Sequence, residues 1–556
     1  MINIEKEIIR DINQRIDSQQ KKGQKVTRED IPSIFDAIIK IKLFDPTPYS
    51  EEDYKKIAID KIRICSIIAS STPTSVGKIS IIEKKSSDHI QWVPKQKQDA
   101  WHFTERFKEY LMQDINFNPD TINSLCETSS KILSRLENPN RPGKWGRKGL
   151  IFGDVQSGKT SSYSALINQA ADTGYKIIII LGGLNNNLRS QTQIAIEENF
   201  RGYRTNTANN PSVDAVGVGK ITQYQLQKPE IHTTRDINGD FKKNVMNSKK
   251  NNDYDAKNIN LYVIKKNVSP LNFLFDLLQS KINEVEDLPV LLIDDESDHG
   301  SINTKKPEYN PTAINTKIRL ILDIFNRTSY VAYTATPFAN IFISKKEQEF
   351  TVKFKGDKVA IDAEGNELTE VKNGKLIKKI EEKTRSVKDH NLFPEHFIIN
   401  LPSNSNYIGG KKLFNIPDNL DESEDRHPLP VVLTSEKILD YNDDKLKLEE
   451  EWIPQKHNKD YIFKYDGSEN DISPTLKYAI KCFILSIAAR NLRMGENQHH
   501  TMLINITNWN DTNTQIVKLV DTELNDYILP GLKGNFPNVI NTFKDIWIND
   551  FCKTTK

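Results

Sequence analysis

The chain contains few cysteines, and none of them has a spacing that binds metal. Its 556 residues include only four, Cys65, Cys126, Cys482 and Cys552, which lie far apart and form no C-x-x-C pair. Disulfide-stabilised domains and zinc sites need paired or clustered cysteines. The sequence therefore argues against both and favours a reducing, cytoplasmic location.

Long apolar runs and an excess of one charge are also missing. No stretch approaches the roughly 18 apolar residues of a membrane helix, and the first residues, MINIEKE, do not resemble a signal peptide. The formal net charge is only +2, from 77 basic and 75 acidic residues. We therefore expect no membrane contact, and any nucleic-acid contact must come from a local basic face.

Motifs of metal-dependent nucleases are absent as well. The nearest imitation of a PD-(D/E)xK pattern is Asp418 with DDK at 443–445, in a charged stretch that has no apolar strand to hold metal ligands rigidly. The ten histidines form no His-Asn-His pattern, and the pair His499-His500 is most simply a surface feature. The sequence argues against intrinsic endonuclease activity.

What the chain does have is a complete phosphate-loop motif, GDVQSGKT at 153–160. In such a loop glycines let backbone N–H groups turn toward phosphates, the lysine reaches the β- and γ-phosphates, and the threonine ligates Mg²⁺. An apolar run at 149–152 precedes the motif and a helical pattern at 161–173 follows it, so a helix N-terminus points toward the phosphates. A chance match in a glycine-rich turn is the alternative. The motif predicts ATP and Mg²⁺ as cofactors, bound by Gly153, Gln156, Ser157, Gly158, Lys159, Thr160 and Ser161.

An acidic segment follows a second apolar run, in the sequence VLLIDDESD at 290–298. This pattern is typical of a buried parallel strand with carboxylates at its C-terminal end. With the phosphate loop upstream it predicts a catalytic centre in which Asp295 and Thr160 hold Mg²⁺ and Glu296 deprotonates the attacking water. Lys159 completes the predicted catalytic set. A solvated acidic turn is the alternative.

A third strand pattern, YVAYTATP at 330–337, ends in a T-A-T-P turn. The hydroxyls of Thr334 and Thr336 are suited to hydrogen-bond the carboxylates of the acidic segment, and with Asp298 they form the predicted coupling residues. An ordinary turn at the end of a strand is the alternative.

In this order the three motifs resemble helicase superfamily two and, more closely, the Z1 domain family. The resemblance implies a helicase-like ATPase of bacterial antiviral defence loci, often labelled an endonuclease, with nucleic acid (most simply DNA) and an effector nuclease or other defence subunits as partners. It leaves a homo-oligomer open, and it implies that Arg189, Gln191 and Thr192 contact a nucleic-acid backbone. The similar segments, which span roughly residues 140–510, are 149–199, 264–267 (IKKN), 291–298, 329–342, 397–402, 406–410 and 500–505.

The chain departs from this family in one respect. Family members continue into a second RecA-like lobe that supplies arginine fingers, whereas no arginine follows Arg493 here. Because such a finger raises turnover by about 10³ to 10⁵, we expect this chain alone to bind ATP and to hydrolyse it slowly. We favour a truncated sequence, and the alternative is an arginine from another subunit.

The remaining patterns predict an α/β protein with four regions. Helical spacing predicts an N-terminal helical domain at 1–140, in which Trp92, Trp101 or Phe103 either stacks on adenine or belongs to a helical core. A RecA-like P-loop lobe with a parallel sheet is predicted at 141–345.

Within that lobe, a polar stretch at about 202–258 is predicted to be an insertion with long loops. Alternating residues predict a small β insertion at 346–392. A Z1-type region and the start of a second RecA-like lobe are predicted at 393–556, with helices at 473–494 and 515–529 and a strand at 501–506.

Two functions fit these features. One is an ATP-hydrolysing motor that acts on nucleic acid in a defence complex. The other is a scaffold that binds ATP as an assembly signal and recruits an effector nuclease without steady turnover.

Overall fold

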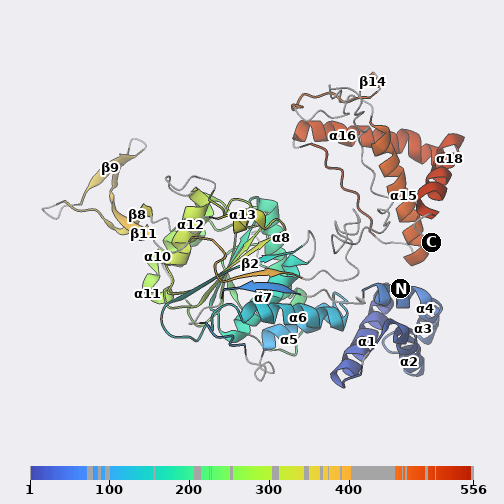
Figure 1. Cartoon of the computed structure of the whole chain (residues 1–556), viewed down its shortest axis with the longest axis horizontal. Helices are drawn as coiled ribbons and strands as arrows, with labels where there is room; N and C mark the ends of the chain where they lie inside the picture. The colour runs from blue at the N-terminus through green and yellow to red at the C-terminus, as the bar shows by residue number, and fades with distance from the viewer. Residues whose placement is uncertain are drawn as a thin grey trace. The chain divides into compact units, whose positions relative to one another are not determined.

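The computed structural model divides the chain into two compact units, Met1–Tyr407 and Ile408–Lys556, and each is described by itself (Figure 1). The residues that the structure describes are 2–24, 26–71, 79–84, 89–93, 101–153, 158–205, 214–224, 226, 228–250, 255–303, 312–343, 350–362, 367–372, 375–387, 391–401, 457–465, 468–469, 472–494, 499–507 and 509–552.

An eight-stranded sheet of order β1-β12-β2-β7-β6-β3-β5-β4 forms the centre of the first unit. All neighbouring strands from β12 to β4 run parallel, and only β1 pairs antiparallel, with β12. The prediction of an α/β fold with a mostly parallel sheet is confirmed. The strands are β1 (Ser80–Glu83), β2 (Trp145–Phe152), β3 (Ile177–Gly182), β4 (Glu230–Ile231), β5 (Asn260–Ile264), β6 (Val290–Asp295), β7 (Arg327–Thr334) and β12 (Phe397–Asn400).

Helices cover both faces of this sheet. The central strands β3 and β6 are almost continuously aliphatic because both of their faces are buried. Helices α10 and α12 pack against one face, and α7 with the end of α6 packs against the other. The helices of the first unit are α1 (Ile2–Lys21), η1 (Arg28–Asp30), α2 (Ile31–Phe44), α3 (Glu51–Ile59), α4 (Lys61–Ser71), α5 (His102–Gln113), α6 (Pro119–Leu133), α7 (Lys159–Thr173), α8 (Asn186–Ile196), η3 (Glu197–Arg201), η4 (Gly217–Lys220), α9 (Lys243–Lys250), α10 (Val268–Ser280), α11 (Ile282–Val285), α12 (Ala313–Asp323) and α13 (Phe338–Ile341).

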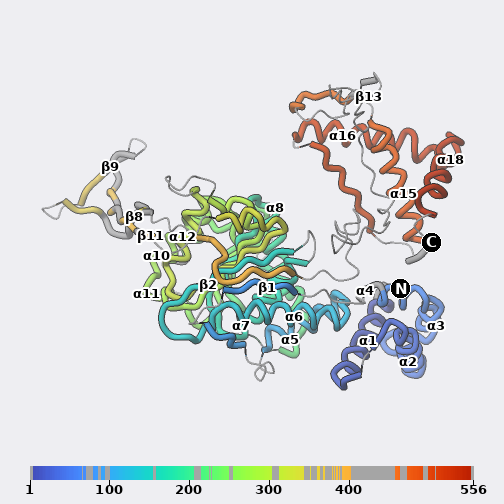
Figure 2. Tube along the Cα trace, viewed as in Figure 1, coloured from blue at the N-terminus to red at the C-terminus, as the bar shows by residue number. Residues whose placement is uncertain are grey.

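The predicted N-terminal helical domain consists of two different parts. Helices α1–α4 form a small bundle with its own core of isoleucines around Tyr54. The rest belongs to the sheet layer: β1 is an edge strand beside β12 (Figure 2), and α5 and α6 pack on α7. The Asp172 carboxylate, near the end of α7, accepts hydrogen bonds from the backbone N–H groups of Phe103 and Thr104, each at 2.9 Å. Short pairings with distant segments thus incorporate β1, α5 and α6 into the sheet layer, and both parts belong to the same compact unit, Met1–Tyr407.

The aromatic residues proposed to stack on adenine contact protein groups. The Trp101 side chain is buried in the core between the sheet and α7. Phe103 packs on Phe200, with ring centroids 5.3 Å apart, and the Trp92 indole N–H donates to the carbonyl oxygen of Leu136 at 3.0 Å. These contacts favour the core alternative.

Two insertions add to the first unit. The polar stretch near 202–258 contributes the edge strand β4 and buries Phe241 and Met246 in the main core, so its described part is more than a solvated loop. In the segment with alternating residues, β8 (Phe350–Val359) pairs antiparallel with β11 (Ile380–Val387), and β9 (Thr369–Lys372) with β10 (Lys375–Lys378). These strands form the arm on the left of Figure 1.

The second unit is mostly helical in its described residues, with one short antiparallel pair, β13 and β14. A small core of Ile472, Ile480, Ile528, Val539 and Phe543 holds it together. The predicted helix at 473–494 corresponds to α15, but residues 501–507 form neither helix nor strand, and no parallel sheet occurs in the described part of this unit. The elements are β13 (Lys464–Tyr465), β14 (Ser468–Glu469), α15 (Pro474–Met494), α16 (Asn510–Thr522), η5 (Glu523–Ile528), α17 (Leu529–Leu532), α18 (Pro537–Ile546) and η6 (Trp547–Phe551).

The predicted second lobe was expected to begin at residue 393, but residues up to Tyr407 belong to the first unit. Strand β12, which starts at Phe397, is part of the sheet of the first unit. Its place depends on Gly149 of β2, because the Phe397 ring covers the glycine opposite it in register. A Cβ atom at Gly149 would lie 2.0 Å from Cζ of that ring, so only glycine leaves space for this pairing.

We expect Gly149→Ala to lower the free energy of unfolding by about 1–3 kcal/mol, because overpacking forces the ring or the strand to move. The matched control is Gly146→Ala in the same strand, where the added Cβ meets Thr328 Oγ1 at 3.4 Å, an ordinary contact. Urea denaturation of both variants measures the difference. Equal losses for the two variants would contradict the role given to Phe397.

Candidate functional site

The three sequence motifs meet at one edge of the sheet. Parallel strands end at the same edge, and in this register Asp295 at the end of β6 lies opposite both Tyr333 of β7 and Gly182 of β3. The backbone N–H of Gly153 donates to the carbonyl oxygen of Thr334 at 3.3 Å. The phosphate-loop motif, the acidic segment and the T-A-T-P turn are therefore neighbours in space.

The end of the phosphate-loop motif caps a helix. Gly158 precedes α7 with φ 88°, in the left-handed region that favours glycine. The Lys159 Nζ donates to the carbonyl oxygen of Gly153 at 3.4 Å, so the ammonium group lies over the beginning of the loop. The predicted residues Gln156 and Ser157 lie outside the described residues. The described part brings a lysine ammonium and a helix N-terminus to the same place, an arrangement that attracts anions.

Tyr163, one turn into α7, connects this helix to the acidic segment. Its hydroxyl donates to Asp295 Oδ2 at 3.3 Å, and its ring packs edge-on against Tyr333, with centroids 5.6 Å apart. Burial and the Asp295 charge raise the pKa of Tyr163, against the smaller, lowering effect of hydrogen bonding with the hydroxyls of Thr160 and Thr192. The phenol stays protonated and joins the two predicted magnesium ligands, Thr160 and Asp295.

Thr160 and Asp295 differ in their surroundings. Thr160 is exposed at the start of α7, and the next predicted residue, Ser161, is half-buried. Burial, and then the neighbouring Glu296 charge, raise the pKa of Asp295 to about 6. No group of three or more His, Cys, Asp and Glu side chains placed to hold a metal occurs in the described part of the chain. A metal here would depend on one hydroxyl and one carboxylate from the protein, as in sites where Mg²⁺ keeps water and phosphate ligands.

Glu296 has an unusual backbone conformation. Its φ is 51°, a left-handed value that is uncommon for residues other than glycine and costs on the order of 1 kcal/mol or more. Its side chain remains 46% exposed, and its carboxylate oxygen Oε2 lies 3.9 Å from Nδ1 of His299. The carboxylate is thus accessible to water at the edge of the sheet while its backbone is held in a strained conformation.

The T-A-T-P turn clamps the last carboxylate of the acidic segment. Asp298 accepts hydrogen bonds from Oγ1 of Thr334 at 2.7 Å and from Oγ1 of Thr336 at 2.5 Å. Burial alone would raise the pKa of Asp298, but these hydrogen bonds keep it below its ordinary value. A second contact, from Asn340 Nδ2 to Ser297 Oγ at 3.0 Å, joins α13 to the same segment. The two threonines make the contact with Asp298 that their sequence pattern suggested.

The nucleic-acid contacts expected from the family resemblance need correction. Arg189 is completely buried, and its guanidinium donates to the carbonyl oxygens of Thr234, at 2.8 Å, and Asp236. Thr192 is also buried, and its hydroxyl donates to the carbonyl oxygen of Leu188 at 3.0 Å. Of the three predicted contacts only Gln191 is exposed. The polar insertion supplies the carbonyl groups that draw Arg189 inward, which a local sequence pattern does not reveal.

Two buried side chains at this edge were missed by sequence reasoning. One is Tyr163, whose only signal was a tyrosine one turn beyond the phosphate-loop threonine. The other is Lys266, in the IKKN segment after β5, whose ammonium donates to the carbonyl oxygens of Asp295 and Glu296. Tyr163 belongs to none of the motifs used above, and the IKKN segment gave Lys266 no role, because both side chains act through hydrogen bonds between elements far apart in the chain.

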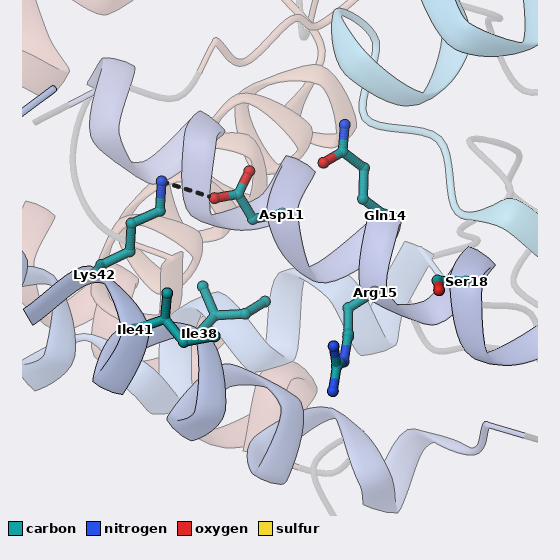
Figure 3. A pocket seen from close by; sticks show the side chains of 7 residues that line it. All are labelled: Asp11, Gln14, Arg15, Ser18, Ile38, Ile41 and Lys42. Atoms are coloured by element: carbon teal, nitrogen blue, oxygen red, sulfur yellow. Dashed lines mark ion pairs between the residues drawn. The ribbon is translucent and has the colours of Figure 1, made fainter. Parts of the chain in front are cut away.

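A groove in the N-terminal bundle is a weaker candidate. It lies along α1 and α2 and is lined by Asp11, Arg15, Ile38 and Lys42, among others (Figure 3). Burial works against the charge of Lys42, but hydrogen bonds to Glu7 and Asp11 prevail and raise its pKa. Because Lys42 of α2 pairs with Glu7 and Asp11 of α1, the cluster holds the two helices together.

The comparisons with known proteins concern the other unit. The family model of the Z1 domain matches residues 475–556. This match supports the Z1 family. The matched Z1 segment lies in the second unit, whereas every residue of the edge described above lies in the first. No curated protein matches the chain, and no described helix is long and apolar enough to cross a membrane.

We expect Asp295→Asn to stabilise the protein at neutral pH. Folding raises the pKa of this carboxyl from 3.8 to about 6, so its ionised form disfavours the folded state, by an amount on the order of 1–3 kcal/mol. The gain from the variant should be complete above about pH 6 and vanish below about pH 4, where the group is protonated in both states. Urea denaturation of variant and wild type at pH 7.5 and pH 4 measures it.

Asp298→Asn is the matched control with the opposite sign. The pKa of Asp298 is lowered, so its ionised form favours folding, and the variant should lose stability at pH 7.5. The same direction of change in both variants would contradict the environments assigned to the two carboxylates.

Proposed function

We propose that the first unit binds and hydrolyses ATP with Mg²⁺, and that the chain is a helicase-like motor subunit that acts on nucleic acid in a bacterial defence complex. One observation carries the ATPase part of this proposal. The G-K-T end of the phosphate loop and the D-E-x-D segment lie on the same sheet edge, where Tyr163 links α7 to Asp295. A chance match to the loop motif would not explain why the motif lies beside two neighbouring carboxylates.

The strand order supports the same assignment. The loop follows β2 and the carboxylates follow β6, while β7 runs between them and presents the T-A-T-P turn. From β2 the chain crosses by α7 to β3 on one side, whereas β12 pairs on the other side of β2. Parallel α/β sheets bind ligands outside the carboxyl ends of their strands at such a change of direction.

The roles follow from the chemistry of phosphoryl transfer, which depends mostly on positioning and on neutralising charge. The Lys159 ammonium would neutralise charge on the β- and γ-phosphates, and the α7 N-terminus would add its partial positive charge. Glu296, exposed and next to Asp295, would orient the attacking water and accept its proton.

The magnesium site is supported by the type of donor. A hydroxyl and a carboxylate, Thr160 and Asp295, are the hard oxygen ligands that Mg²⁺ prefers. Burial, and then the Glu296 charge, raise the pKa of Asp295 to about 6 against the lowering effect of Lys266, so a further cation beside this carboxylate would favour its ionised form. When bound, Mg²⁺ would neutralise phosphate charge.

Fewer observations support the coupling role and the proposed partners. The hydrogen bonds of Asp298 with Thr334 and Thr336 give a direct connection from the carboxylate segment to α13, which supports a relay away from the nucleotide. The nucleic-acid partner and the effector nuclease rest on the resemblance and on the Z1 match, because Arg189 and Thr192 are buried.

A second function, a nucleotide-gated scaffold without steady turnover, is favoured by one observation. Arg189, which follows β3, is buried and donates to carbonyl oxygens, and a site without an arginine finger turns over about 10³ to 10⁵ more slowly. In this alternative the chain binds ATP tightly and the bound state recruits the partner.

Substitution of Lys159 and Glu296 tests the site. We expect Lys159→Ala to weaken ATP binding about 10- to 100-fold, because hydrogen bonds to charged groups contribute about 1.5–3 kcal/mol. Glu296→Gln should keep ATP affinity and lower turnover about 10²- to 10⁴-fold, as expected for loss of a general base. Binding of a fluorescent ATP analogue and phosphate release, each with and without DNA, measure the two effects.

The matched control is Lys176→Ala, which removes an exposed lysine that donates to the carbonyl oxygen of Lys257. It should leave both measurements unchanged. Wild-type ATP affinity in Lys159→Ala would show that the site assignment is wrong, and tight binding of ATP without turnover in the wild type would favour the scaffold.

A further inference from the structure

Lys266 is a buried lysine whose ammonium group contacts three consecutive residues of the acidic segment. Its side chain has no exposed surface, and Nζ lies 3.2 Å from Asp294 Oδ1. The same Nζ donates to the carbonyl oxygen of Asp295 at 2.8 Å and to that of Glu296 at 2.5 Å. The ammonium group thus donates hydrogen bonds to two backbone carbonyl groups, while its contact with Asp294 is an ion pair in which Oδ1 accepts no hydrogen bond from the described residues.

Stability alone does not account for this arrangement. Desolvating a buried ion pair costs about as much as the attraction returns, and an apolar pair of similar volume is often equally stable. The partner carboxylate of Asp294 already accepts a hydrogen bond from the Tyr330 hydroxyl at 2.7 Å. Besides neutralising charge, the lysine donates hydrogen bonds to two consecutive backbone carbonyl groups. An apolar side chain cannot donate these hydrogen bonds.

Those two carbonyls belong to the residues on which the proposed function depends. Glu296 has φ 51°, and a strained conformation of this kind persists only where the surroundings impose it. Lys266 comes from the turn between β5 and α10, so it holds the segment from a different element. Release of the carbonyls would let the backbone at Glu296 relax and redirect both carboxylates.

We propose that Lys266 is a positioning residue that fixes the backbone of Asp295 and Glu296 for ATP hydrolysis. The inference rests on the proposed function. Lys266 acts through these two residues and does not touch the nucleotide. The competing explanation is that the lysine only neutralises the buried carboxylate of Asp294.

A double variant distinguishes these two explanations. Lys266→Met leaves Asp294 without its cation, so a loss of both stability and turnover is expected under either explanation. Lys266→Met combined with Asp294→Asn removes both charges, and the asparagine side chain still accepts from Tyr330. If neutralisation were the only role, the double variant would regain stability and turnover together.

Under our proposal the double variant regains its thermal stability but not its turnover. We expect its kcat to remain about 10²-fold below the wild type, the scale expected for misplaced catalytic groups, with KM for ATP changed less than about threefold. Thermal melting and steady-state ATP hydrolysis of the single and double variants measure this. A folded double variant with wild-type kcat would overturn the positioning role.

The matched control is Lys265→Met, which removes the neighbouring lysine. Its Nζ donates to Asn186 Oδ1 at 2.7 Å and does not reach the acidic segment, so kcat should not change. The wild type reports on the proposed function separately: no ATP turnover, even with DNA, would overturn that function and the inference with it. Wild-type turnover together with an active double variant would overturn the inference alone.

Discussion

The parallel pairing of β2, β7, β6 and β3 is the constraint on which the rest of the structure depends. Because these strands run in the same direction and are buried on both faces, whatever follows each of them emerges at one edge. In this way Tyr163 and Asp295, 132 positions apart in the chain, come within hydrogen-bonding distance. The position of the candidate site is therefore determined first by the direction of the strands and then by individual side chains.

Several residues at this edge of the sheet have features that lower the stability of the folded protein. Burial raises the pKa of Asp295, Glu296 has a left-handed backbone, and Lys266 is buried against Asp294. Each feature costs free energy that a sequence selected for stability alone would avoid. Their concentration at one place, supported by the apolar sheet behind it, is the pattern expected where geometry is kept for chemistry.

The sequence predicted best what depends on neighbouring residues. The end of β2 and strand β6 were recognisable from their apolar runs at 149–152 and 290–293, and the helix after the loop from its local spacing. The edge strands β1 and β4 and the neighbouring strand β12 were missed, since they are short and gain their structure from partners far away in the chain, as Phe397 does from Gly149. The expected strand at 501–506 fails for the converse reason: an alternating pattern forms no strand without a partner, and none pairs with it in the described residues.

The positions of the arginine side chains bear on the choice between the motor and the scaffold. Arg189, the arginine nearest in sequence to the end of β3, is buried and bonded to carbonyl oxygens, so it is poorly placed to stabilise charge that develops on a phosphate. In the proposed reaction Lys159, at the start of α7, neutralises charge on ground-state phosphates as well as in the transition state. Uniform binding of this kind strengthens occupancy more than it accelerates turnover, and so a slow ATPase whose bound state persists reconciles the motor with the scaffold.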